Sequence, residues 1–313
     1  MYLHIMECIA LGTGGMMPMP LRLPTSVLVR RDGRMMMFDA GEGIQLALKK
    51  GGLGIQALDA VAISHLHADH VLGLPGILMF RAQNDYPGPL TIIGPPGIAK
   101  FVRHTLEDLR YHVNFKIKFV EWSRSASRHA WSWHGAELYW EELHHSTFCL
   151  GYRLEESTRP GKFHPDRAER LGVPPGPLFG KLQSGETIEL PSGKTVEPED
   201  VLGPERRGRV MAFATDTRPC PGLLELVQGA DIAFTEGMFA LEHQREAVEK
   251  KHMTASEAAE AVASVGAQRL VLVHISPRYT REDEARLQAE ARHHFPGADV
   301  ARPLGAYSIP LPD

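Results

Sequence analysis

The stretch AISHLHADH, residues 62–70, gathers three histidines and an aspartate directly behind an apolar run. Residues two apart in an extended chain point the same way, so His65 and His67 can reach one metal ion. A turn at Ala68 would let Asp69 and His70 face a second ion. Imidazole and carboxylate ligands suit zinc, with manganese or iron as substitutes. A merely solvated loop is disfavoured, because polar side chains rarely gather so densely behind a buried strand.

Further ligands are expected where other strands end, because these four residues cannot complete a two-metal site alone. Three positions qualify: the pair His144-His145, Asp216 in FATDTRP and His274 in LVHISPRY. A single histidine at a strand end is more often a hydrogen-bonded structural residue than a ligand. All three positions close a strand-like run, however, and this shared placement favours ligation for the set.

The remaining chain alternates short apolar runs with segments of helical spacing, which is typical of an α/β layered protein. Its 313 residues can form one domain, residues 1–313. Thr254 and Glu257 have the spacing of a helix capping box. The expected strands are Cys8–Leu11, Ser26–Arg30, Met35–Asp39, Ala60–Ser64, Leu90–Ile93, Phe115–Val120, Glu137–Glu141, Leu150–Leu154, Val210–Ala214, Asp231–Thr235, Leu270–His274 and Ala306–Ile309. The expected helices are Gly43–Lys49, Leu74–Ala82, Gly97–Leu109, Gly222–Gln228, Thr254–Val265 and Arg281–His294.

Composition excludes several classes of protein. A chain with 43% hydrophobic and 23% charged residues is neither disordered nor a coiled coil. The net charge of −4 means that any affinity for nucleic acid must come from local patches. The cysteines form no CxxC pair, which fits a reducing compartment. We find no signal peptide and no apolar run near the ~20 residues of a membrane span, so a cytoplasmic protein without membrane contact is expected.

One segment, residues 157–208, is rich in proline, glycine and charge, with only short apolar runs. Loops of this length are usually functional or disordered. Between residues 158 and 181, five basic residues face two acidic ones. Charge alone leaves a solvated insertion and a phosphate-binding arm equally plausible. The five basic residues are Arg159, Lys162, Arg167, Arg170 and Lys181.

The motif HLHADH resembles the HxHxDH motif of the metallo-β-lactamase superfamily, and Asp39 in FDAGEG matches an aspartate that ends an early strand there. Within that superfamily the whole chain resembles the short form of ribonuclease Z, in LGTGG, SHLHADHVLGLPGIL, IIGPPGI, GYRLEE and LVHISPRY. The PGP segment of LGVPPGPLFGKLQSGETI resembles that family's tRNA-binding arm. The resemblance implies an αββα sandwich of two mixed β-sheets flanked by helices, with residues 157–208 inserted as a flexible arm.

The resemblance also assigns roles to single residues. It implies one zinc ion held by His65, His67 and His145, a second held by Asp69, His70 and His274, and Asp216 as their bridge. His145 is preferred to His144 because it lies six residues before Gly151, as in the family.

Three residues are implied in proton handling. Asp69 would hold the proton of the nucleophile, and His252, oriented by Glu236, would protonate the leaving ribose 3′ oxygen. The residues implied in substrate binding are Pro18, Arg22, Pro175, Gly176, Pro177, Lys162, Arg167, Arg170 and Lys181.

The implied activity is that of a zinc-dependent endoribonuclease, a homodimer, that removes the 3′ trailer of precursor tRNA. Two Zn²⁺ ions per subunit would generate a hydroxide that attacks the phosphodiester, leaving a tRNA 3′-hydroxyl and a 5′-phosphorylated trailer. Two alternatives remain: a hydrolase of cyclic nucleotides, lactones or thioesters, and a non-catalytic RNA-binding protein.

The chain also departs from the motifs of the family at two places. It reads Thr235-Glu236-Gly237-Met238 where members usually read His-Glu-Ala-Thr, and its Pro18–Arg22 loop lacks the lysine and asparagine of PxKxRN. The altered loop puts discrimination of the CCA end in doubt.

Some apolar residues have simpler interpretations. Met16 and Met17 are interpreted as packing or strand residues. Trp131, Trp133 and Trp140 are expected on a hairpin, in the core or at a dimer interface.

Overall fold

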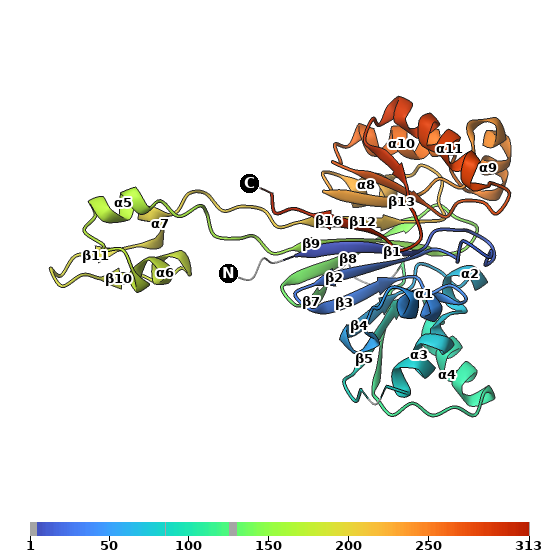
Figure 1. Ribbon diagram of the computed structural model, residues 1–313, viewed down its shortest axis with the longest axis horizontal. Coiled ribbons are helices and arrows are strands. Elements are labelled where there is room, and N and C mark those ends of the chain that lie inside the picture. The colour runs from blue at the N-terminus through green and yellow to red at the C-terminus, as the bar shows by residue number, and fades with distance from the viewer. Residues whose placement is uncertain (1–4, 85, 125–129, 313) are drawn as a thin grey trace.

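Two β-sheets packed face to face, with helices on both outer faces, form the body of the molecule, and a long arm projects from it (Figure 1). The computed structural model describes residues 5–84, 86–124 and 130–312. This arrangement confirms the expected αββα architecture with two mixed sheets.

The first sheet has the strand order β16-β1-β2-β3-β4-β5-β6. Strands β16 to β3 pair antiparallel, and β3 to β6 pair parallel. Its strands are β1 (Met6–Gly12), β2 (Ser26–Arg31), β3 (Arg34–Phe38), β4 (Leu58–Ala62), β5 (Leu90–Gly94), β6 (Ile117–Glu121) and β16 (Gly305–Ile309).

The second sheet repeats this plan, with the order β15-β14-β13-β12-β9-β8-β7. Here β15 to β12 pair parallel and β12 to β7 antiparallel. Its strands are β7 (Trp131–Trp133), β8 (Ala136–Leu143), β9 (Cys149–Glu156), β12 (Val210–Ala214), β13 (Ile232–Glu236), β14 (Leu270–Val273) and β15 (Ala298–Val300).

Each layer boundary is filled by apolar side chains. Between the sheets, Phe38 contacts Phe213 at a ring-centroid distance of 5.5 Å, and Tyr152, Trp133 and Trp140 are buried in the same cluster. The two tryptophans therefore belong to the core. The helices of the body are α1 (Ile44–Lys50), α2 (Ala68–Val71), α3 (Leu74–Ala82), α4 (Ile98–Asp108), α8 (Pro221–Val227), α9 (Gln244–Lys250), α10 (Ala255–Ser264) and α11 (Arg281–His294), with short 3₁₀ turns at Ile55–Ala57 and Leu241–His243.

The arm between β9 and β12 contains regular structure instead of one long loop. Apolar residues scattered through the segment bury one another in a small separate core, among them Ala168, Leu182 and Val201. Two extended segments connect the arm to β9 and β12. They come so close at Gly161 and Gly203 that a β-carbon on Gly161 would lie 1.9 Å from the Gly203 carbonyl oxygen. The elements of the arm are α5 (Pro165–Arg170), α6 (Pro177–Gln183), α7 (Pro198–Val201), β10 (Ile188–Glu189) and β11 (Thr195–Val196).

The chain turns at Ala68 as expected, because the short helix α2 begins there. Two other local features differ from the expectations. Met16 and Met17 are about half exposed, at 51% and 50%, and do not pack into the core. Strand β15 was not expected, because its three residues carry little periodicity.

The capping box of Thr254 and Glu257 is present at the start of α10, as expected. Among the described residues, no helix is long and apolar enough to span a membrane.

Candidate active site and metal centre

The candidate ligands converge at one edge of the sandwich, where parallel strands present their carboxyl ends. Asp39 follows β3, Asp216 follows β12 and His274 follows β14. All three have left-handed backbones, with φ of 56°, 52° and 57°. Such conformations cost roughly 1–3 kcal/mol each in non-glycine residues and cluster at functional sites. Strand ends thus aim these side chains into a common space.

The first ligand group consists of His65, His67, His145 and Asp216, whose donor atoms all lie within 4.8 Å of one another. The Nε2 atoms of His65 and His145 are each 3.7 Å from Asp216 Oδ2. The Nε2 atom of His145 lies 3.4 Å from His67 Nδ1.

The second group consists of Asp69, His70 and His274. Asp69 Oδ2 is 3.4 Å from His70 Nε2 and 3.3 Å from His274 Nε2. The same two nitrogens lie 3.3 and 3.2 Å from Asp216 Oδ1. Asp216 therefore turns Oδ2 toward the first group and Oδ1 toward the second, so that one carboxylate faces both groups.

The chemistry of these donors fits divalent metal ions. The buried Nε2 atoms of His65 and His70 have no hydrogen-bond partner, which is costly unless a ligand satisfies them. Burial holds the pKa of His65 well below its ordinary value, so its imidazole is neutral and can bind metal. Burial alone would raise the pKa of Asp216, but the imidazoles of His274 and His70 hold it well below its usual range. The cluster is a divalent metal site.

A layer of hydrogen bonds orients the ligands. Asp39 Oδ2 accepts from His70 Nδ1 at 2.7 Å, and its Oδ1 accepts from the Ser64 backbone at 2.7 Å. The Ser64 hydroxyl lies 3.0 Å from His65 Nδ1. His145 Nδ1 donates to the Lys251 carbonyl at 3.2 Å. Such partners fix the tautomer of a metal-binding histidine and leave its other nitrogen for the ion.

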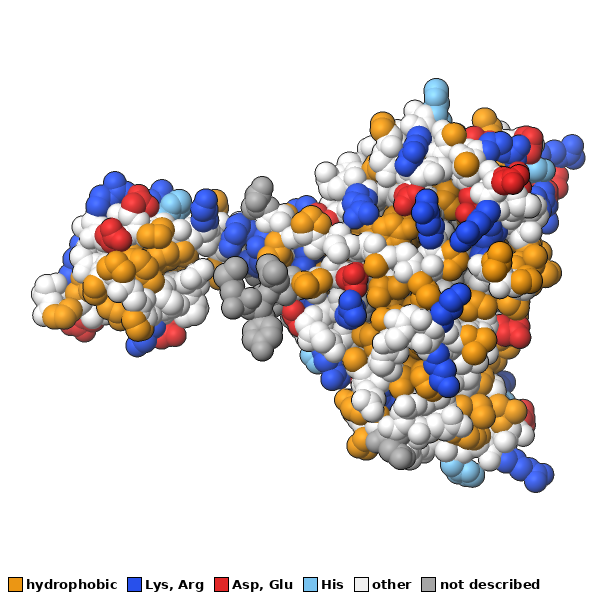
Figure 2. Space-filling view, viewed as in Figure 1, with side chains coloured by type: hydrophobic (Ala, Val, Ile, Leu, Met, Phe, Trp, Pro, Cys, Tyr) orange, Lys and Arg blue, Asp and Glu red, His pale blue; other side chains and the backbone are white. Residues whose placement is uncertain are grey.

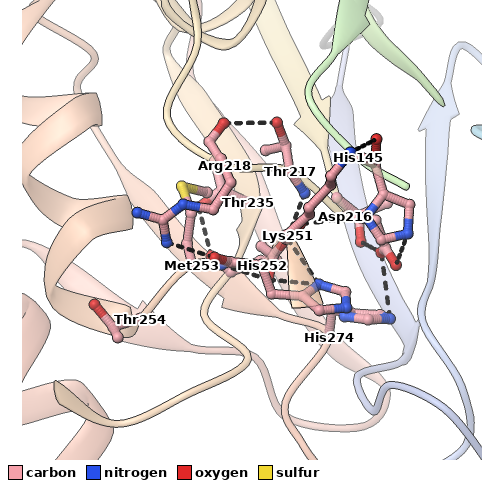
Figure 3. Close-up of polar contacts among 12 residues, drawn as sticks. His145, Asp216, Thr217, Arg218, Thr235, Lys251, His252, Met253, Thr254 and His274 are labelled. Atoms are coloured by element: carbon pink, nitrogen blue, oxygen red, sulfur yellow. Dashed lines mark hydrogen bonds and ion pairs between the residues drawn. The ribbon is translucent and has the colours of Figure 1, made fainter. Parts of the chain in front are cut away.

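His252 and Glu236 form a buried pair beside the ligands. His252 Nδ1 lies 3.1 and 3.2 Å from the two carboxylate oxygens of Glu236. The imidazole sits between His145 and His274, with ring centroids 5.1 and 5.4 Å away (Figure 3). Burial disfavours its charged form, but the Glu236 carboxylate outweighs burial and raises the pKa of His252 to about 9. The imidazole is thus held by Glu236 beside the metal ligands.

Arg218 fixes the backbone of the loop that carries His252. Its guanidinium donates to the His252 carbonyl oxygen at 2.6 Å and to the Glu257 carboxylate at 2.5 and 2.9 Å. The Glu236 carboxylate also accepts from the Met253 backbone at 3.0 Å. The loop that carries His252 is therefore tied to β13 and to the first turn of α10 (Figure 3).

The loop before β2 covers the site from the side of the second ligand group. The Met16 backbone donates to Asp69 Oδ2 at 2.6 Å. Gly15 packs so closely on His274 that a β-carbon there would come within 2.8 Å of the imidazole ring. In the same loop Pro18 is exposed, whereas Arg22 is largely buried in an ion pair with Glu284. The Arg22 guanidinium is consequently engaged within the protein.

The remaining sequence-predicted residues lie elsewhere. His144 is exposed beside His145 and makes a backbone bridge to Arg218. The arm residues that the sequence singled out are exposed and belong to α5, α6 and the segments next to them: Lys162, Arg167, Arg170, Pro175, Gly176, Pro177 and Lys181. They are not part of the ligand cluster.

Sequence reasoning missed the residues that support the ligands. Ser64 acts through its hydroxyl group, Lys251 through its own backbone carbonyl, and Arg218 through a bond to the backbone carbonyl of His252. Ser64 could have been noticed because it precedes His65 directly. Arg218 and Lys251 carry no local signal, since their partners lie 34 and 106 residues away.

The fold and the ligand cluster define a metal-dependent hydrolase of the metallo-β-lactamase superfamily. A family model for the β-lactamase superfamily domain matches residues 184–275, and one for the Anti-Pycsar protein Apyc1 matches residues 6–156. The structure superimposes on human tRNase Z, short form, with a TM-score of 0.69 and 23% identity, over 97% of this chain and 100% of that one.

Relatives that are similar in sequence show to which family within this superfamily the chain belongs. Ribonuclease Z of Treponema denticola is 42% identical over 93% of this chain and 94% of its own. Ribonuclease Z of Salinibacter ruber is 39% identical over 97% of this chain and 94% of its own. The chain belongs to the ribonuclease Z family.

Proposed function

We propose that this protein is an endoribonuclease that removes the 3′ trailer of precursor tRNA, with two Zn²⁺ ions per subunit. The observation that carries the proposal is the pairing of two ligand groups through Asp216 with the adjacent His252–Glu236 pair. Two neighbouring metal positions suit in-line displacement at phosphorus, and a proton donor beside them suits departure of an alcohol. The names of the relatives supply the substrate.

The polar residues divide the steps of the reaction among them, and Asp69 serves both as a ligand and as a proton acceptor. Ions bound by the two groups would activate water and neutralise charge on the phosphate. Asp69, held by the Met16 backbone, takes the proton of the attacking water. His252, held by Glu236, donates a proton to the ribose 3′ oxygen as it leaves. The products are a tRNA with a 3′-hydroxyl and a trailer with a 5′-phosphate.

Two features of the arm favour the proposal that the substrate is tRNA and that the protein is a homodimer. Figure 2 shows Lys and Arg side chains along the edge of the arm that carries α5 and at its neck. Strand β12 begins at the arm and ends before Asp216, so its five residues alone separate the two by about 17 Å. The arm also points away from the site of its own chain (Figure 1). It therefore serves the site of a second subunit, gripping backbone phosphates far from the cut.

Cleavage of an end-labelled precursor tRNA with a 3′ trailer tests the function. We expect one cut after the discriminator nucleotide, with a 3′-hydroxyl on the tRNA fragment, and no cut by the Asp69→Ala variant. A matched precursor that carries CCA shows what the altered Pro18–Arg22 loop does. An intact precursor, together with hydrolysis of cyclic nucleotides or lactones by the same zinc-loaded protein, would refute the tRNA assignment while retaining the site.

A further inference from the structure

A second cavity, of about 400 Å³, adjoins the metal centre and is used by none of the steps above. Leu66, which lies between His65 and His67 and is 40% exposed, forms part of its wall. Thr147 and Phe148, two and three residues after His145, form another part. The cavity is therefore formed in part by the two loops that carry the first ligand group.

The lining is flat and largely apolar. Pro95 and Pro96 contribute rigid rings beside Leu66, and Phe148 is half-buried. Trp140 supports Phe148 edge-on, with ring centroids 6.4 Å apart and an interplanar angle of 80°. Aromatic side chains of this kind stack unpaired bases of single-stranded RNA.

One cation completes the cavity. The Arg124 guanidinium lies 5.3 Å from the centroid of the Phe148 ring and is held by bonds of 2.8 and 2.9 Å to the Glu142 carboxylate. Guanidinium planes and aromatic faces recur together in sites for unpaired nucleotides. Arg124 thus lies over the Phe148 ring and adds a positive charge at the edge of the cavity.

The neighbouring cavity has the opposite character. It measures about 600 Å³, shares Arg124, Thr147 and Phe148 with the first, and its polar lining includes Glu142, Lys251 and the ligand His145. The apolar cavity is therefore connected through it to the first ligand group.

From these contacts we propose that the cavity formed by Leu66, Pro95, Pro96, Thr147, Phe148 and Arg124 binds one unpaired nucleobase next to the scissile phosphate, by stacking on Phe148. The proposal rests on the proposed RNA substrate and adds a subsite to it. The subsite reads the flat face of a base, so it positions the strand with little preference for sequence.

A double-mutant cycle between protein and substrate tests the subsite. Phe148→Ala and the wild type are compared on a precursor tRNA with all its bases and on precursors with an abasic nucleotide on either side of the cut. Base–aromatic stacking is worth about 1–3 kcal/mol, which corresponds to roughly a 5- to 150-fold change in kcat/KM. We expect the variant to lose this factor on the complete precursor, and to lose much less when the abasic nucleotide occupies the flanking position that the subsite serves.

Two controls separate stacking from damage to the fold. Tyr139→Ala removes an aromatic ring that is 41% exposed on the neighbouring strand β8 and lies outside the cavity, and it should show no such dependence on the base. Bound metal per chain is measured for each variant. An equal loss for Phe148→Ala on complete and abasic precursors would overturn the subsite, while cleavage of the complete precursor by the wild type would leave the proposed function standing.

Discussion

Asp216 turns one oxygen toward each ligand group, and His252 lies beside them as the proposed proton donor. His252 is also close enough to Asp216 and His274 to be a ligand itself, since the donor atoms of the three residues lie within 4.8 Å of one another. Its Nδ1 contacts with both Glu236 oxygens favour the role of proton donor. The two roles differ in what is lost when the imidazole is removed.

We expect His252→Ala to lower kcat on precursor tRNA by about 10²- to 10⁴-fold, the usual contribution of a general acid. Bound zinc should stay at the wild-type level, because both ligand groups remain intact. Glu236→Gln should show a smaller loss, since the imidazole stays but its charged partner is gone. Loss of metal in parallel with activity would instead identify His252 as a ligand.

A buried ion pair at the root of the arm should make stability depend on pH. Glu156 binds Arg209 at 2.7 Å and Arg31 at 2.5 Å. Burial opposes its charge, but the two guanidinium groups lower the pKa of Glu156 to about 2, against an ordinary value of 4.5. Because the pKa is lower in the folded state, the pair stabilises the protein fully above pH 4.5 and this contribution is lost as the pH falls toward 2.

Glu156→Gln should therefore cost roughly 3–5 kcal/mol of unfolding free energy at pH 7, since it leaves buried charge without its partner. The difference from the wild type should shrink steadily between pH 5 and pH 3. Urea unfolding of both proteins in the presence of chelator measures this without interference from metal loss. A difference that stays constant over this range would show that the charge of Glu156 contributes nothing.

Single residues differ in how far the sequence could reveal them. The ligands at strand ends could be predicted from the sequence, because both their residue type and their position indicate a ligand. The HLHADH run, Asp216 and His274 all appear where an apolar run stops. Arg218 could not be predicted from the sequence, because its effect on His252 depends on a contact that is made only in the folded chain. Arg22 kept its place in the family motif, yet its ion pair with Glu284 could not be seen from the sequence.

Among the structural elements, the arm was the least predictable. Its apolar residues are too sparse to show a period, and its helices of four to seven residues each begin at a proline that reads equally well as a loop. Long elements such as α3 and α11 were placed with the same bounds by sequence and structure, because their starts or their apolar spacing are unambiguous.

Neutralising the arm should weaken the electrostatic part of tRNA binding. We expect a variant with four basic arm residues changed to glutamine to show a shallower dependence of kcat/KM on salt. If all four contact phosphates, the slope of log kcat/KM against log salt falls by about 3 to 4. The changed residues are Lys162, Arg167, Arg170 and Lys181. A control variant with the same change at Lys49, Lys50, Lys116 and Lys118, outside the arm, should retain the wild-type slope. Equal slopes for the two variants would contradict a phosphate-binding arm.

The placement of arm and site at opposite ends of β12 predicts cooperation between subunits. A chain in which residues 162–202 are replaced by a short Gly-Ser linker between Gly161 and Gly203 keeps its site but lacks the arm. A full-length Asp216→Ala chain keeps the arm but lacks the site. Each alone should fail to cut precursor tRNA, and a mixture that has exchanged subunits should cut it. An inactive mixture, with exchange verified, would place the arm in service of its own chain.

The proposed mechanism depends most on Asp216 as a bridge between two metal positions. Bound zinc per chain, measured by mass spectrometry after loading and dialysis, tests this directly in the wild type, His145→Ala and His274→Ala. We expect two ions in the wild type and one in each variant, because each variant damages a different group. A wild type that binds a single ion, or variants that lose both ions together, would contradict it.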